Sequence, residues 1–249
     1  MTINTAKNTV VRQFHPAPQA PARLVCLAHA GGSASAYLPL SRELSPRVDV
    51  LAVQYPGRQD RRAEPCLTDI SDLAAEAVTA ILPFLDRPTA LFGHSMGATV
   101  AFEAARLLER EHGHTVTRLF VSGRRAPCTT RPESVHRRDD DGLLAEIRLL
   151  SGTDSAILAD DEIMRMALPA LRGDYTAIET YRPEPGAVTA APITVLTGSD
   201  DIRTSADEAA AWARHTTAGC AVHTYTGGHF FLTGHRAAVA RLVARHLLG

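Results

Sequence analysis

The chain has 249 residues, of which 45% are hydrophobic, and this length and composition suit a single domain with a buried core. Its formal net charge of -1 gives no long-range field that would recruit nucleic acid or an anionic membrane surface. The first twenty residues hold no apolar signal region, and no apolar run is long enough to cross a bilayer. We therefore expect a cytoplasmic monomer with no nucleic-acid or membrane partner.

Short apolar runs alternate with amphipathic segments along the chain, a pattern typical of a parallel sheet covered by helices. Behind Asp69, apolar residues of 70–85 recur at helical spacing and predict a helix that Asp69 caps. A similar stripe over 239–247 predicts a C-terminal helix. The predicted strands are 24–29, 48–53, 89–92, 118–122, 193–196 and 221–225.

The interval 134–185 interrupts this alternation. It has no convincing strand, but helix-like stretches follow Asp139 to Asp141 and again Asp160 and Asp161. Pro169 is expected to kink or end the second helix. We expect a helical insertion within one domain of residues 1–249, placed as a lid over the site. The alternative is a helical subdomain that only packs.

The segment T-A-L-F-G-H-S-M-G at 89–97 runs from a predicted strand through G-x-S-x-G into a predicted helix at 98–111. This is the context of the nucleophile elbow of the α/β-hydrolase fold, a mostly parallel sheet flanked by helices. In such a turn the serine is strained, and side chains at Gly93 and Gly97 would collide with neighbouring elements. The pattern predicts Ser95 as the nucleophile of a serine hydrolase.

The acid and the histidine follow the nucleophile along the chain in this fold. His229, in T-G-G-H-F-F-L, alone among the late histidines lies in a loop after the last predicted strand, so we expect it to be the base. The acid should follow the strand at 193–196, where both Asp200 and Asp201 stand. Spacing alone does not separate these two aspartates.

Two backbone amides are predicted to bind the oxyanion of an acyl-transfer site. Met96 follows the nucleophile, and Ala30 lies in H-A-G-G after the strand at 24–29. His29 is expected to be a structural hydrogen-bonding residue, because Ser95 can use only one imidazole. The cysteines form no C-x-x-C pair and lie beside no histidine cluster, so we expect reduced thiols and no metal site.

Motifs spread over nearly the whole chain resemble the type II thioesterases, the stand-alone editing thioesterases of polyketide and nonribosomal peptide assembly lines. In that family the acid stands eleven residues before a tryptophan. Asp201 stands eleven residues before Trp212, so the resemblance implies Asp201 as the acid. The motifs are H-A-G-G-S-A-S-A-Y at His29, Q-Y-P-G-R-Q-D-R at Gln54, G-H-S-M-G-A at Gly93, S-G-R-R-A-P at Ser122 and G-G-H-F-F-L at Gly227.

The resemblance implies hydrolysis, through an acyl-serine, of acyl groups on the phosphopantetheine arm of an acyl or peptidyl carrier protein. Its implied role is to remove aberrant or stalled groups from an assembly line, and this chemistry requires no cofactor or metal. The alternatives are a small-ester esterase or an acyltransferase of the same fold. A non-catalytic binding module is disfavoured, because Ser95, Asp201 and His229 are all present.

Carrier docking is predicted at Arg58, Arg61 and Arg62, which should lie at the carboxyl edge of the sheet near the mouth of the site. An arginine patch there could steer the acidic helix that carrier proteins commonly present. The alternative is that these arginines are separate solvated charges or form structural ion pairs. It is favoured more strongly for Arg124 and Arg125, which follow the end of another strand.

Overall fold

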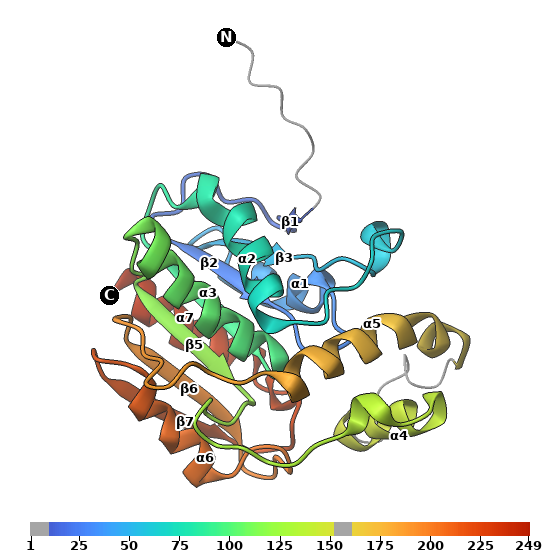
Figure 1. The fold of residues 1–249 in the computed structure, drawn as a ribbon. Coiled ribbons are helices and arrows are strands. Elements are labelled where there is room, and N and C mark those ends of the chain that lie inside the picture. The colour runs from blue at the N-terminus through green and yellow to red at the C-terminus, as the bar shows by residue number, and fades with distance from the viewer. Residues whose placement is uncertain (1–9, 152–160) are drawn as a thin grey trace.

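A seven-stranded sheet forms the centre of the computed structural model, which describes residues 10–151 and 161–249 (Figure 1). The strand order is β1-β3-β2-β4-β5-β6-β7, with β1 antiparallel to β3 and all other neighbours parallel. The strands are β1 Val11–Arg12, β2 Arg23–Leu27, β3 Asp49–Val53, β4 Thr89–His94, β5 Arg118–Ser122, β6 Ile193–Gly198 and β7 Cys220–Tyr225.

The six predicted strands are all present, and their ends differ from the prediction by two residues at most. Every residue of β2, β3, β4 and β6 is buried, which is why these strands are rich in apolar residues and show no strict alternation with polar ones. The two-residue β1 was not predicted. It is too short to show a pattern, and it exists through pairing with β3, with Val11 opposite Val53.

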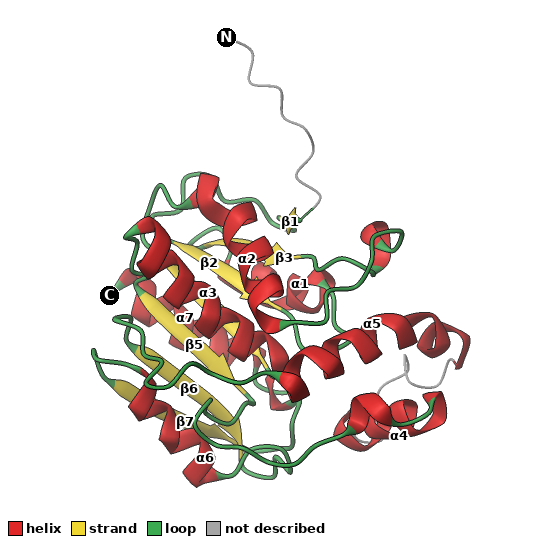
Figure 2. Cartoon of the chain, viewed as in Figure 1, coloured by secondary structure: helices red, strands yellow, loops and turns green. Residues whose placement is uncertain are grey.

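Helices cover both faces of the sheet (Figure 2). Helices α2 and α3 pack together on one face, and α1 and α7 pack together on the other. The α-helices are α1 Leu38–Leu44, α2 Ile70–Ile81, α3 Met96–His112, α4 Asp140–Ser151, α5 Asp161–Thr180, α6 Ala206–Ala210 and α7 Arg236–Leu248. Short 3-10 helices cover Ala34–Tyr37, Gln59–Arg61, Leu82–Phe84, Val135–Arg137, Ala211–His215 and Phe231–Thr233.

Local capping sets several helix ends. The Asp69 side chain accepts a hydrogen bond from the Ser71 amide at 2.7 Å, as the sequence predicts, and α2 begins there. Gly113, with φ 61°, ends α3 in the left-handed conformation that glycine adopts without strain. No described helix combines the length and the apolar character needed to cross a bilayer.

Helices α4 and α5 lie within the predicted insertion at 134–185 and pack against each other beside the sheet (Figure 1). Pro169 does not end the second helix, because α5 continues through it to Thr180. A proline costs an internal helix hydrogen bond, but the buried neighbours Ala170 and Leu171 pack that stretch, and tertiary packing overrides propensity. Residues 152–160 of the insertion, including Asp160, lie outside the described residues. Its action as a lid stays a prediction.

Candidate active site

Ser95 occupies the tight turn between β4 and α3. Its backbone has φ 54° and ψ −120°, a conformation that residues with a Cβ rarely adopt. The Ser95 amide donates to the Ser122 carbonyl at 2.8 Å, which ties the turn to the end of β5. The serine therefore stands at the N-terminus of α3, where the helix dipole favours developing negative charge.

The two glycines that flank this serine are required by close backbone contacts. A Cβ on Gly93 would lie 2.0 Å from the carbonyl oxygen of Gly97. A Cβ on Gly97 would lie 2.1 Å from the carbonyl oxygen of Leu27 at the end of β2. Backbone atoms cannot move aside as a flexible side chain can, so the expected collision at both positions is confirmed.

His229 and Asp201 come together at the carboxyl ends of β6 and β7. The His229 Nδ1 atom lies 3.0 Å from Oδ2 and 3.1 Å from Oδ1 of Asp201. The side chains are 2% and 0% exposed, respectively. Asp200 is exposed, and its carboxylate accepts a hydrogen bond from the Ser199 hydroxyl. Of the two aspartates, Asp201 is therefore the one that can hold the Nδ1–H tautomer and leave Nε2 free to accept a proton.

Backbone contacts fix the loop that carries His229. The Asp200 amide donates to the Gly227 carbonyl at 2.9 Å. A Cβ on Gly198, the last residue of β6, would lie 2.4 Å from the carbonyl oxygens of both Gly227 and Gly228. The loop after β7 thus packs on the end of β6, which brings His229 to the acid.

Two further imidazoles lie near His229. The His94 ring centroid is 5.2 Å from that of His229, and the His29 ring packs 5.0 Å from Phe230. Burial, and then the neighbouring His229, lower the pKa of His29 to about 4 and hold the pKa of His94 well below 6.5, so both rings are neutral at pH 7. Among the described residues no group of three His, Cys, Asp or Glu is placed to hold a metal ion.

The sequence predicts His29 as a structural hydrogen-bonding residue, and the structure corrects this. Within the described residues the His29 ring makes no hydrogen bond and instead packs edge-on against Phe230 and, at 6.0 Å, His94. Of the two imidazoles that lie near His229, His94 is the one that forms a hydrogen bond, with its Nδ1 atom 3.0 Å from the Ser122 hydroxyl. The apolar F-F-L segment next to His229 supplies the ring against which His29 packs, so packing rather than hydrogen bonding holds it.

Ser95 and His229 share this edge of the sheet without a direct hydrogen bond between them in the described part of the chain. The residue before Ser95, His94, contacts the His229 ring. Gly123, at the end of β5, fits beside both rings: a Cβ there would lie 2.6 Å from Cε1 of His94 and 3.5 Å from Cε1 of His229. In hydrolases without substrate the nucleophile–base hydrogen bond is often long and tightens in the complex.

The two predicted oxyanion amides lie on adjacent segments. Met96 is the first residue of α3, so its amide has no partner within the helix. The close approach of Gly97 to the Leu27 and Ala28 carbonyls places this helix end against the loop that contains Ala30. Neither amide donates to a loop or turn carbonyl in the described residues.

Helix α5 adds a buried carboxylate, Asp174, that sequence reasoning missed. Its Oδ2 accepts the Gly31 amide at 2.7 Å, next to Ala30, and both of its oxygens accept from the Arg58 guanidinium. Arg58 also donates to the Gly32 carbonyl at 3.0 Å. A signal was available, since Asp174 is a carboxylate on the apolar face of a helix. The buried apolar neighbours on that face are Ala170, Leu171, Ala177 and Ile178.

A family model described as a thioesterase domain matches residues 22–247. The chain belongs to the thioesterase family. It is 51% identical over 248 residues to the probable cadicidin biosynthesis thioesterase of Streptomyces griseus, covering 98% of this chain and 68% of that protein. It is 49% identical over 247 residues to thioesterase PikA5 of Streptomyces venezuelae, covering 99% of this chain and 88% of PikA5.

Solved structures agree with this assignment. The thioesterase superposes on the type II thioesterase BorB from the borrelidin biosynthetic cluster with a TM-score of 0.90 at 50% identity, over 95% of this chain and 97% of BorB. YbtT, a type II thioesterase from the yersiniabactin NRPS/PKS pathway, superposes with a TM-score of 0.85 at 30% identity, over 96% of this chain and 98% of YbtT. The α/β-hydrolase fold and the resemblance to type II thioesterases are confirmed, and the enzyme hydrolyses thioesters.

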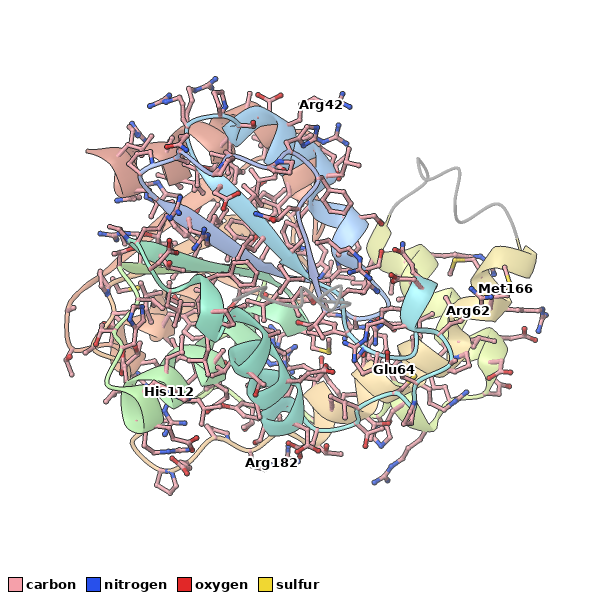
Figure 3. The ribbon with its side chains drawn as sticks, turned by 90° about the horizontal axis from the view of Figure 1, so that it is seen from above. Arg42, Arg62, Glu64, His112, Met166 and Arg182 are labelled. Carbon is pink, nitrogen blue, oxygen red and sulfur yellow. The ribbon has the colours of Figure 1, made fainter. Side chains whose placement is uncertain are left out.

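The structure corrects the predicted docking patch of the thioesterase. Arg58 is buried against Asp174, and Arg61 is buried between Glu64 and Glu76, so neither presents a free charge to a partner. A buried guanidinium needs carboxylate partners to offset the loss of its hydration. Arg58 and Arg61 therefore form structural ion pairs, which was the alternative to docking. Arg62 alone of the three is exposed (Figure 3).

Proposed function

We propose that this thioesterase hydrolyses acyl thioesters on the phosphopantetheine arm of an acyl or peptidyl carrier protein and so removes aberrant or stalled groups from a polyketide or nonribosomal peptide assembly line. Similarity over nearly the full length to BorB and YbtT, named as type II thioesterases of such pathways, supports this substrate. One observation carries the chemistry: a strained serine at a helix N-terminus shares an edge of the sheet with an imidazole held by a buried carboxylate.

Acylation begins when Nε2 of His229 takes the proton from the Ser95 hydroxyl, whose oxygen attacks the thioester carbonyl carbon. Asp201 stabilises the imidazolium that forms, because its carboxylate lies 3.0 Å from Nδ1. The amides of Ala30 and Met96 bind the oxyanion. Collapse of the tetrahedral intermediate breaks the carbon–sulfur bond, and the imidazolium protonates the departing thiolate.

Deacylation repeats the sequence with water. His229 takes a proton from the water as its oxygen attacks the acyl-serine, and the same two amides bind the second oxyanion. The imidazolium then returns the proton to Ser95. The net reaction converts one thioester and one water into a carboxylic acid and the free thiol of the carrier.

The test compares turnover of one acyl group on a carrier protein, on coenzyme A and on a simple oxygen ester, with Ser95→Ala as the control. We expect the highest kcat/KM for the carrier thioester and a loss of several orders of magnitude in the variant. Faster turnover of the oxygen ester would favour the esterase alternative. Transfer of the acyl group to an added alcohol or amine in place of water would favour the acyltransferase.

A further inference from the structure

The loop that carries Asp201, residues 199–205, connects β6 to α6 and is called the acid loop below. A main-chain amide of this loop holds the acid. The Arg203 amide donates to Oδ1 of Asp201 at 2.8 Å, and this oxygen lies 3.1 Å from Nδ1 of His229. The residue between them, Ile202, is 58% exposed, so burial of its apolar side chain does not anchor the turn.

The Arg203 side chain ties the acid loop to two other segments. Its Nη1 atom donates at 3.0 Å to Oε1 of Glu133, which lies after β5. Its Nη2 atom forms an ion pair with Oε1 of Glu146 on α4. The Glu146 side chain is 2% exposed and that of Arg203 is 23% exposed. Arg203 therefore connects the acid to a helix of the insertion at 134–185.

Glu146 is an unusual residue for its position. It is buried, as are Leu143 and Leu144 of the same helix, and an apolar side chain would fill such a place without the cost of dehydrating a carboxylate. A buried ion pair adds little stability over an apolar contact, but each charge requires its partner opposite it. The pair with Arg203 thus specifies where α4 sits on the acid loop.

We propose that Arg203 is a positioning residue for the catalytic acid and that α4 supports Asp201 through it. The ion pairs fix the Arg203 main chain, its amide fixes the carboxylate, and the carboxylate orients His229. A misplacement of about 1 Å in a catalytic group can cost about a hundredfold in rate. The inference rests on the proposed function, because it acts through the triad assigned there, and it gives α4 a part in catalysis.

The experiment measures kcat and KM of Arg203→Met on butanoyl-pantetheine. The variant should fold, because neither carboxylate is left alone. Glu133 keeps its contact with Arg125 at 3.2 Å, and the Tm reports any residual loss of stability. Glu146 keeps Arg138 at 3.1 Å. We expect kcat to fall by about tenfold or more with KM within about twofold, since the orientation of the acid matters mainly in the transition state.

Three further variants separate this role from a general effect on α4. Arg203→Lys, which keeps a cation beside the two glutamates, should recover part of the loss. Glu146→Gln removes the charge that holds Arg203 and should lower kcat in the same direction. Arg138→Met removes the other partner of Glu146, lies outside the acid loop, and should keep kcat near the wild-type value. Equal losses in Arg138→Met and Arg203→Met would overturn the proposal, because disruption of α4 would then explain both.

A double variant tests whether Arg203 acts through the acid. In the Asp201→Asn background, Arg203→Met should cost less than about twofold, since the interaction that it supports is already lost. An equal loss in both backgrounds would overturn the proposal, as would wild-type kcat in Arg203→Met or in Glu146→Gln. The proposed function is tested separately by Ser95→Ala. Full turnover in that variant would defeat the assigned chemistry, whereas its loss together with wild-type kcat in Arg203→Met would defeat this inference alone.

Discussion

Arg58 and Asp174 form a buried bidentate ion pair, with Nη1 2.7 Å from Oδ2 and Nη2 2.8 Å from Oδ1. The pair joins two segments that are 116 residues apart in sequence, the loop after β3 and helix α5. Asp174 also accepts the Gly31 amide, so the helix is bonded to the loop whose Ala30 amide we assign to the oxyanion. Close packing also holds α5 against this loop, because a Cβ on Gly31 would lie 2.3 Å from the Leu171 side chain of α5.

Replacing Asp174 with Ala is expected to lower both stability and kcat. The change leaves the Arg58 guanidinium buried without its carboxylate, and breaking such a pair costs about 3 to 5 kcal/mol. It also frees the Gly31 amide and with it the neighbouring oxyanion loop. Denaturant unfolding and steady-state kinetics measure the two effects. Asp140→Ala, at an exposed carboxylate paired with Arg172, is the matched control. Wild-type stability and kcat in Asp174→Ala would show that the ion pair does not hold this loop.

Asp201→Asn is expected to lower kcat by several orders of magnitude, whereas Asp200→Asn should leave it near the wild-type value. The amide can no longer hold the Nδ1–H tautomer of His229, while Asp200 is exposed and bonded to Ser199. A pre-steady-state assay of acyl-enzyme formation tests both variants at equal protein concentration. A severe loss in Asp200→Asn with a mild one in Asp201→Asn would move the acid by one position.

Much of the fold could be read from the sequence because its strands are buried on both faces. Such strands appear as short apolar runs whatever their order in the sheet. The elbow was equally visible, since Gly93 and Gly97 are forced by contacts within and beside one turn. The two-residue β1 and the continuation of α5 through Pro169 were not visible, because both depend on packing against distant parts of the chain.

The residues of the site were likewise predictable from the sequence only in part. Order along the chain was enough to select His229, and the family resemblance implied Asp201 where spacing alone did not separate it from Asp200. The contact between the Asp201 carboxylate and the His229 ring is visible only in the fold. The partners of Asp174 lie 143 and 116 residues away, and no local pattern encodes them. R-Q-D-R has the composition of a solvated loop, so the burial of Arg58 and Arg61 could not be predicted from it.

Acid is expected to destabilise the fold through His29. Its folded-state pKa of about 4 lies below the unfolded value near 6.5, because of burial first and then of His229 and Arg58. Between these two pH values the unfolded chain binds more protons than the folded one, so stability rises with pH from about 4 to 6.5. Above pH 6.5 the titration of His29 no longer changes the free energy of unfolding. The contribution of His29 is about 3 kcal/mol across the window.

Thermal unfolding of the wild-type enzyme and of His29→Gln at several pH values tests this contribution. The dependence of Tm on pH between 4 and 6.5 should be shallower in the variant. His112→Gln, at an exposed histidine (Figure 3), should keep the wild-type dependence. Part of the slope should survive in His29→Gln, because His94 is also buried with a lowered pKa. Identical slopes in His29→Gln and the wild-type enzyme would show that His29 does not titrate in this way.

Carrier docking at the loop after β3 stays a prediction, and because Arg58 and Arg61 are buried, Arg62 is the arginine of the three that is left to test. We expect Arg62→Glu to raise KM for an acyl-carrier protein several-fold and to leave hydrolysis of an acyl-pantetheine unchanged, because a charge at the edge of a contact mainly affects association. Added salt should weaken the carrier reaction preferentially, since exposed charges are screened within about 10 Å at 0.1 M ionic strength.

Arg42→Glu makes the same charge change at an exposed position on α1 (Figure 3) and serves as the control. Arg61→Glu would be uninformative, because it places a third carboxylate beside Glu64 and Glu76 and should unfold the loop. Equal losses of Arg62→Glu on carrier and pantetheine substrates would indicate damage to the pocket. An unchanged carrier KM would place docking on another surface, and the exposed side of α5 would be the next to test, because that helix is bonded through Asp174 to the oxyanion loop.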